Sequence, residues 1–154
     1  MTADSTFRIG IISGKLGGVD GVSQEVDKWV AVLRDFGHDV FTIAGQYSSP
    51  LTSIPADNQL RLEPIGFDYP RQLKHQRLVF PHLSRHASHL SDRQIEELTE
   101  TLRAEGAEVA GRIFEYLRDN AIDVLIAENT NAMPMTLSGG IAVHRLATEK
   151  RVAT

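Results

Sequence analysis

The stretch that most constrains the fold is residues 7–21, FRIGIISGKLGGVDG. Residues 7–12 form a short, mostly apolar run that predicts a buried strand. Glycines follow at positions 14, 17, 18 and 21, where the chain must turn sharply and pack closely, and a helical pattern begins at Val22. A strand, a glycine turn and a helix in this order place backbone N–H groups around an anion. The sequence therefore predicts either a loop that holds a phosphate or a sugar, or a purely structural tight turn.

The spacing of these glycines leaves the ligand of the loop open. They give the pattern G-x-x-G-G-x-x-G, which differs from the dinucleotide fingerprint G-x-G-x-x-G. The P-loop signature G-K-[ST] is also missing, because Leu16 follows Lys15 where a hydroxyl residue is required.

A β-α-β unit follows from the residues around the glycines. Asp20 is the expected N-cap of the first helix, and Gly37 stands where a C-cap glycine belongs. Residues 38–44 predict a second strand that Gly45 ends, so the two strands form a parallel pair with a right-handed crossover. The helix is expected to bury one apolar face, made by Val22, Val26, Trp29, Val30, Leu33 and Phe36.

The second half of the chain repeats this alternation. A helix from Ser91 or Asp92 to about residue 119 is expected to bend or break at Gly106, and its apolar face is Ile95, Leu98, Leu102, Val109, Ile113 and Leu117. Residues 122–127 predict a third strand, buried on both faces, and residues 135–150 predict another helix. Residues 151–154 look like the opening of a further strand, so the domain looks truncated. The fold class is an α/β, Rossmann-like open parallel sheet with helices on both faces.

Residues 46–91 interrupt this pattern. Five of the six prolines lie here among polar residues, although residues 60–63 suggest a short strand and 71–79 a turn or two of helix. Such an excursion predicts a functional loop or lid, and a variable surface insertion is the alternative. We therefore expect one domain, 1–154, with an irregular insertion at about 46–91.

The charge pattern isolates part of this insertion. The chain carries a net charge of −4, yet residues 69–91 contain no acid and four cations, Arg71, Lys74, Arg77 and Arg85. This argues against nucleic-acid binding and favours either an anion patch, for a phosphorylated or carboxylated acceptor or anionic lipid, or a solvated basic face. His82, His86 and His89 have helical spacing, but no carboxylate lies nearby to complete or orient a metal site, so none is predicted.

Other function classes are excluded by composition. The chain has no cysteine, so disulfides and thiolate chemistry are excluded. The first residues do not resemble a signal peptide, and no apolar run approaches the ~18 residues of a membrane span. A cytoplasmic protein is expected.

The segments 9–23, 37–40 and 122–134 resemble the N-terminal domain of GT-B-fold, retaining glycosyltransferases of family 4. They read IGIISGKLGGVDGVS, GHDV and IDVLIAENTNAMP, respectively. The version with LGGxDGVS and a strand ending AEN is most similar to the mannosyl-glucosyl-glycerate synthase-like branch.

The resemblance implies roles for residues of the loop at 14–21, which we call the glycine loop. Gly17 and Gly18 match glycines whose backbone lies against the donor pyrophosphate and the acceptor. Asp20 and Ser23 match positions near the acceptor, with helix capping as the alternative, and Lys15 would pair with an anionic acceptor or remain solvated.

At the end of the third predicted strand, Glu128 and Asn129 would bind sugar hydroxyls, with a strand-end loop network as the alternative. Because ligands bind beyond the carboxyl ends of strands in such sheets, these residues should share an edge with the glycine loop. Arg77 and Arg85 are further candidates for binding an anionic acceptor.

The resemblance also implies that this chain is one wall of a cleft. In the family, a second domain binds the nucleotide, and that domain has no counterpart here. The implied reaction is a hexosyl transfer that uses a nucleoside diphosphate-sugar as donor and no other cofactor. It would need the second domain in cis or in trans. We expect that the chain alone does not transfer sugar. We also consider that it forms a homo-oligomer. The alternatives are a non-catalytic Rossmann-like module for a phosphorylated or sugar ligand, and a regulatory partner of a complete transferase.

Overall fold

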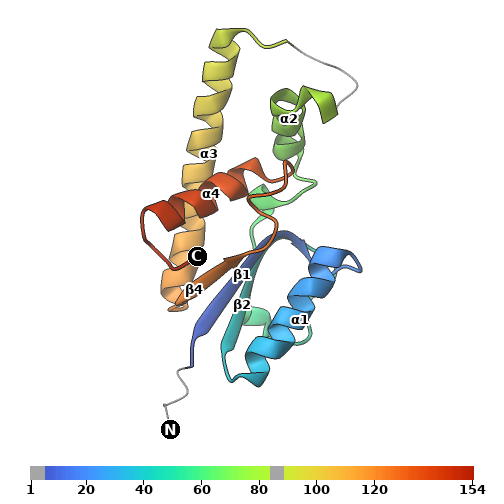
Figure 1. Ribbon diagram of the computed structural model, residues 1–154, viewed down its shortest axis with the longest axis vertical. Coiled ribbons are helices and arrows are strands. Elements are labelled where there is room, and N and C mark those ends of the chain that lie inside the picture. Colours follow the sequence, from blue (N-terminus) through green and yellow to red (C-terminus); the bar gives the residue numbers. More distant parts are fainter. Residues whose placement is uncertain (1–5, 84–88) are drawn as a thin grey trace.

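The computed structural model describes residues 6–83 and 89–154 and contains an open parallel sheet (Figure 1). The strand order is β3-β2-β1-β4, and all three pairings are parallel. The strands are β1 (Arg8–Leu16), β2 (Asp39–Tyr47), β3 (Gln59–Arg61) and β4 (Val124–Ala127). The predicted fold class is confirmed.

Helices cover both faces of this sheet (Figure 1). One face carries α1 (Gly21–Asp35), and the other carries α3 (Asp92–Asp119) and α4 (Leu137–Thr148). The remaining helix, α2 (Pro70–Val79), stands beyond the carboxyl edge of the sheet, beside the first half of α3. Three short 3-10 helices complete the described elements: η1 (Ala56–Asn58), η2 (Glu63–Ile65) and η3 (Pro81–Leu83).

Two hydrophobic cores lie on the two sides of the sheet. Ile11 packs with Val26 and Val30 of α1, whereas its neighbour Ile12 packs with Ile113 of α3 and with α4. Successive residues of a strand point to opposite faces, so a strand between two helical layers must be apolar at every position. This explains the continuous apolar runs from which the strands were predicted.

Two glycines that suggested turns lie inside strands instead. β1 continues through Gly14 to Leu16, and β2 continues through Gly45 to Tyr47. A Cβ on Gly14 would collide with the ring of Phe67, and one on Gly45 would collide with the backbone of Gly66. The expected ends of both strands are therefore wrong, because these glycines permit close packing and do not turn the chain.

The capping residues predicted for α1 are confirmed. Asp20 is the N-cap and accepts a hydrogen bond from the amide of Ser23, and Gly37 follows the helix with φ of +81°. The predicted apolar face is only partly correct. Val26 and Val30 are buried, but Trp29 and Phe36 are exposed, because the sheet covers only a narrow stripe of the helix.

The segment 46–91 contributes to the core. It contains β3 and α2, close to the predicted short strand and helix, and the side chains of Leu62 and Ile65 are fully buried. The loop after η2 is the one that packs Gly66 and Phe67 against the strands. These contacts do not fit a surface insertion, and they hold part of the segment over the carboxyl edge of the sheet.

The long helix α3 is not broken at Gly106. It is continuous from Asp92 to Asp119, and a Cβ on Gly106 would collide with Ile141, so this glycine allows α4 to cross closely. Ser91 is the N-cap, with a capping box that includes Gln94. After α4, Ala153 forms a parallel bridge with Val124, in agreement with the strand expected there.

Candidate functional site

At the carboxyl edge of the sheet, the strands do not all end at the same level. β4 pairs with β1 only up to Ala127, opposite Ile12, and the amide of Glu128 donates to the carbonyl of Ile12 at 2.9 Å. β1 and β2 continue together to Leu16 and Tyr47. The glycine loop and Glu128 therefore open on the same edge, as expected, but the glycine loop lies farther along the strand direction.

Gly17 ties the glycine loop to the end of β2. Its φ is +71°, a conformation that favours glycine, and a Cβ there would also collide with the carbonyl oxygen of Ser49. The hydroxyl of Ser49 donates to the carbonyl of Gly17 at 2.8 Å. The need for glycine at this position is thus explained by contacts within the chain.

Gly18 and Asp20 form a hydrogen-bonded network around Ser23, which is almost fully buried. The Ser23 hydroxyl donates to Oδ2 of Asp20 at 3.0 Å and accepts from the amide of Gly18 at 3.1 Å. The Ser23 amide donates to Oδ1 of Asp20 at 3.0 Å. Both predicted ligand-binding residues, Asp20 and Ser23, therefore also cap the helix, and the Gly18 amide is already satisfied.

The charge of Asp20 shapes what this loop can bind. The hydrogen bond from the Ser23 amide holds the pKa of Asp20 below its ordinary value, and the nearby Lys15 acts in the same direction. Lys15 is half-buried and has no ion pair among the described residues. Because the loop presents an ionised carboxylate, it suits a hydroxyl donor such as a sugar better than a second anion.

Glu128 and Asn129 are available to a ligand. Both are half-buried, and neither side chain forms a hydrogen bond or ion pair within the described parts of the chain. Asn129 has a φ of +56°, and the next residues connect to α4 through the Asn131 amide group, which donates to the carbonyl of Gly140 at 3.3 Å. The strand-end network thus involves the residues after the predicted pair.

A pocket of about 270 Å³, which we call the edge pocket, lies at the ends of β2 and β3. Its polar residues include a guanidinium, two carboxylates, an amide and a phenol, from Arg61, Glu63, Asp68, Gln46 and Tyr69. Arg61 and Glu63 form an exposed ion pair at 3.1 Å. Sequence reasoning missed Gln46, Arg61, Asp68 and Tyr69 because they come from segments whose structure it left open, whereas Glu63 is recognisable from the sequence as an acid at a strand end. The signal available was a polar, Pro-flanked run after the short strand.

The described cations of the predicted basic patch lie on α2, away from the glycine loop. Arg71 pairs with Glu105 of α3 at 3.3 Å, and Arg77 lies in the last turn of α2 with no contact to the glycine loop or Glu128 among the described residues. Arg85 lies outside the described residues. None of the helices described has both the length and the apolar character needed to cross a membrane.

The three histidines considered as metal ligands are not placed on one α-helix. His82 lies in η3, His89 lies in an irregular stretch before α3, and His86 is outside the described residues. Within 6–83 and 89–154, no three histidine, cysteine or acidic residues come together in a way that could hold a metal ion.

The chain is 28% identical over 140 residues to the mannosylglucosylglycerate synthase of Thermotoga maritima. This match covers 91% of the chain but 29% of that protein, so the chain spans less than a third of the relative's length. No protein-family model matches the chain, and no solved structure matches it. The match supports a distant relationship to a glycosyltransferase.

Proposed function

We propose that the carboxyl edge of this sheet binds the sugar acceptor in a glycosyl transfer reaction that uses a nucleotide-sugar as donor. The observation that carries the proposal is that the glycine loop, Glu128 and the edge pocket all open at the same end of one parallel sheet. The class of reaction, glycosyl transfer, is taken from the name of the relative, mannosylglucosylglycerate synthase. In this proposal the chain is the acceptor-side domain of a GT-B-fold, retaining enzyme of family 4.

The edge offers the chemistry that a sugar acid requires. The carboxylates of Asp20 and Glu128 can accept hydrogen bonds from sugar hydroxyls, and the Asn129 amide can both donate and accept. The product named for the relative contains glycerate, which carries a carboxylate. In the edge pocket, Arg61 is the cation that can bind such a carboxylate in a bidentate manner.

This chain offers fewer groups for binding the phosphates of the donor than for binding the acceptor. The Gly18 amide is used by Ser23, and the first turn of α1 offers the N–H groups of Gly21 and Val22. With Asp20 ionised beside them, these groups alone hold a diphosphate poorly. We therefore assign most of the phosphate binding to a second domain, supplied in cis or in trans, and a contact with the donor to Gly17 and Gly18.

The acceptor role can be tested by titrating the chain with glucosylglycerate in a calorimeter. We expect Arg61→Gln and Asp68→Asn each to weaken binding by about tenfold, which corresponds to the loss of one good polar contact of ~1.4 kcal/mol. The Arg61–Glu63 pair is exposed and contributes little to stability, so the fold should persist. Arg112→Gln, an exposed arginine on α3, is the matched control. Equal affinity in all four proteins would exclude the edge pocket as the acceptor site.

A further inference from the structure

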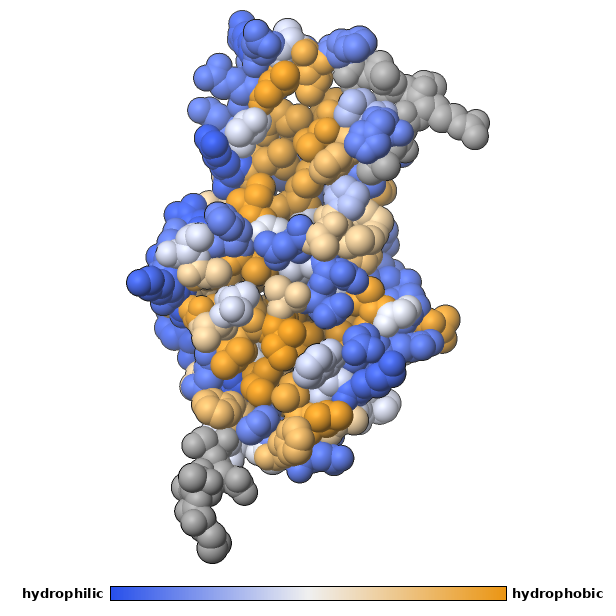
Figure 2. All heavy atoms as spheres, viewed as in Figure 1, coloured by the Kyte–Doolittle hydropathy of each residue, from blue (hydrophilic) through white to orange (hydrophobic). Residues whose placement is uncertain are grey.

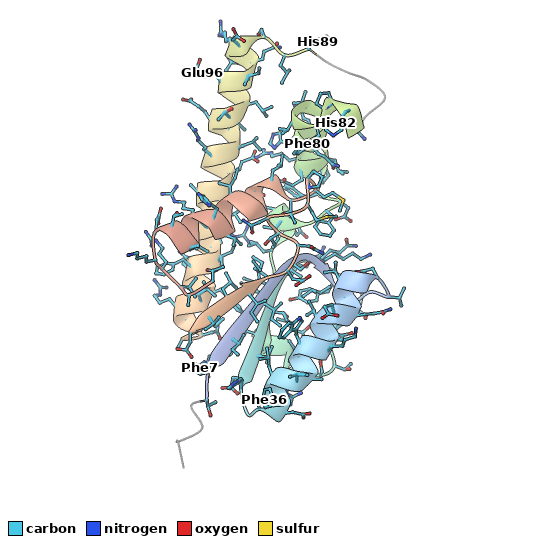
Figure 3. All side chains as sticks on the ribbon, in the orientation of Figure 1. Phe7, Phe36, Phe80, His82, His89 and Glu96 are labelled. Atoms are coloured by element: carbon cyan, nitrogen blue, oxygen red, sulfur yellow. The ribbon has the colours of Figure 1, made fainter. Side chains whose placement is uncertain are left out.

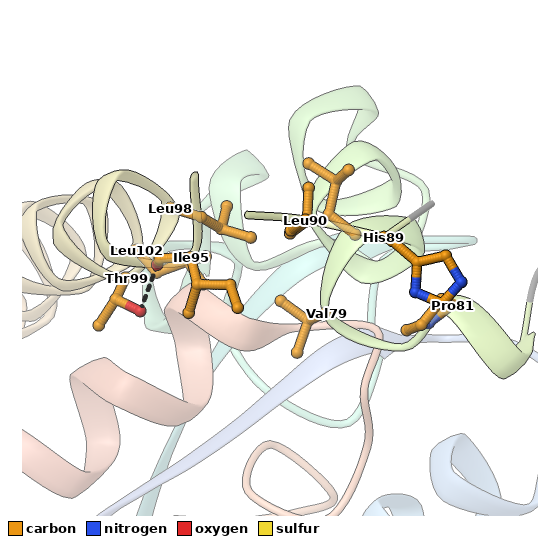
Figure 4. Close-up of a pocket in the computed structure, with 9 residues that line it drawn as sticks. Val79, Pro81, His89, Leu90, Ile95, Leu98, Thr99 and Leu102 are labelled. Atoms are coloured by element: carbon orange, nitrogen blue, oxygen red, sulfur yellow. Dashed lines mark hydrogen bonds between the residues drawn. The ribbon is translucent and has the colours of Figure 1, made fainter. Parts of the chain in front are cut away.

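An apolar groove of about 430 Å³, which we call the helix groove, lies between the end of α2 and the beginning of α3 (Figure 4). Figure 2 shows apolar side chains gathered between the projecting half of α3 and α2, with hydrophilic residues along the borders. The residues that line the groove are Leu78, Val79, Pro81, His89, Leu90, Ile95, Leu98, Thr99 and Leu102. The helix groove lies apart from the glycine loop, Glu128 and the edge pocket, and it shares no residue with them.

Two apolar side chains that line this groove are exposed to solvent. Ile95 is 50% exposed and Val79 38% exposed, although Ile95 belongs to the apolar face of α3 that is buried farther along the helix. The hydroxyl of Thr99 donates to the carbonyl of Ile95 at 2.8 Å, so it needs no partner from outside. A concave surface of this kind favours an apolar occupant.

The two helices that flank the groove differ in charge. The sequence of α2 contains three cations and no acid, whereas the first turns of α3 contain Asp92, Glu96, Glu97 and Glu100 against one arginine, Arg93. Arg93 pairs with Glu97 at 2.8 Å. Lys74 and Arg77 of α2, and Glu96 and Glu100 of α3, form no ion pair among the described residues.

We propose that the helix groove is the contact surface of a homodimer. A two-fold axis that runs parallel to α2 and α3 sets the basic α2 of each copy against the acidic start of the other copy's α3. A two-fold axis perpendicular to the helices would instead set α2 against α2 and α3 against α3, so that like charges would face one another. Because α2 and α3 run roughly antiparallel (Figure 1), the first arrangement also forms an antiparallel four-helix contact that buries both apolar surfaces. This inference does not depend on the proposed function.

Sedimentation equilibrium of the purified chain at low ionic strength tests the proposal. We expect a monomer–dimer equilibrium, and we expect Ile95→Glu to raise the dimer dissociation constant at least about tenfold, as the loss of a buried apolar contact does. The matched control is Val32→Glu, which places the same charge on an exposed valine of α1. Circular dichroism should show the same helix content in all three proteins.

Charge reversal provides a test that does not depend on the apolar variant. Lys74→Glu with Arg77→Glu should weaken the dimer, Glu96→Lys with Glu100→Lys should do the same, and the four changes together should restore it. Raising the salt concentration should weaken the wild-type dimer by screening the same pairs. A chain that stays monomeric at hundreds of micromolar, an Ile95→Glu protein that associates like the wild type, or a quadruple variant without restored association would each overturn the proposal.

Discussion

Asp20 is the single residue that decides most about the glycine loop. It caps α1, fixes Ser23, and through Ser23 occupies the amide of Gly18. A loop with four glycines suggests a cradle for phosphate, but the carboxylate within it repels an anion and accepts hydrogen bonds from hydroxyl groups. In the proposed function, the residue that holds the hydrogen-bonded network of the loop together is thus also the one that favours a sugar over a phosphate.

The capping role of Asp20 predicts a pH-dependent contribution to stability. Asp20→Ala should cost about 1 kcal/mol of unfolding free energy at neutral pH, the usual value for a lost N-cap. The folded-state pKa of Asp20 lies below its ordinary value of 3.8, so the ionised form stabilises the fold above that pH. The stabilisation is lost as the pH falls through the lower, folded-state pKa. Urea unfolding of both proteins at pH 7 and near pH 3 should show the difference shrinking.

Asp27→Ala is the control for this measurement, because Asp27 is exposed on the same helix and has no hydrogen-bond partner among the described residues. Alanine has the higher helix propensity, so this variant should be as stable as the wild type or slightly more. A loss of stability at Asp20 that stays constant between the two pH values would show that its charge is not involved.

At the scale of elements, α2 connects the carboxyl edge of the sheet to the helical layer. Its residue Gln72 is 2% exposed and accepts from the amide of Leu137 at 2.9 Å, at the first residue of α4. Its amide nitrogen donates to the hydroxyl of Ser138 at 2.7 Å. The N-cap of α4, Thr136, makes no side-chain capping bond, so a residue from a distant helix caps α4 in its place.

A second connection joins α2 to α3. Oε1 of Glu105 lies 3.3 Å from Nη1 of Arg71, and Oε2 lies 3.3 Å from Nδ1 of the buried His75. The His75 contact does not have the geometry of a hydrogen bond. Because Arg71 and His75 are both engaged with Glu105, part of the basic segment serves to position α2, and only the cations farther along the helix remain available to a partner.

We predict that Gln72→Ala destabilises the protein by about 1–3 kcal/mol, because it leaves the part-buried Leu137 amide of α4 without an acceptor. Gln76→Ala, on the same helix, removes a glutamine with no side-chain hydrogen bond in the described structure, and it should cost less than about 0.5 kcal/mol. Guanidinium unfolding followed by circular dichroism gives both values. If the two variants lose the same stability, Gln72 does not cap α4.

At the scale of the whole molecule, the sheet separates two cores and gathers its polar groups at one edge. That edge holds the glycine loop, Glu128 and the edge pocket, whereas the helix groove lies away from them on α2 and α3. Figure 3 shows His82 and Phe80 beside the end of α2, and His89 near the start of α3. Substrate binding and self-association are therefore assigned to different surfaces.

We predict that the chain does not transfer sugar by itself, because its own edge offers few groups for the donor diphosphate. Release of nucleoside diphosphate from a nucleotide-sugar in the presence of glucosylglycerate should stay at the rate of a buffer control. Addition of a candidate second domain should produce activity that Glu128→Gln lowers. Turnover by the chain alone would contradict the proposed division of roles.

The sequence alone determined the order of the elements and several of their ends. β1, β2 and β4 contain apolar runs because they lie between two helical layers. Asp20 and Ser91 are recognisable caps because capping depends on residues three positions apart. The parallel sheet follows from the strand–helix alternation, and with it the edge shared by the glycine loop and Glu128. These are local or topological properties, which a residue pattern carries.

Only the tertiary structure decided what the glycines and the segment 46–91 do. Gly14, Gly45 and Gly106 read as turns or breaks, yet each allows a distant residue to approach: Phe67, Gly66 and Ile141, respectively. Gln72 caps a helix that begins 65 residues later, and the edge pocket combines residues from the ends of two strands and the loop before α2. Contacts between residues far apart in the chain leave no periodic pattern, so the glycine loop could be found from the sequence while its surroundings could not.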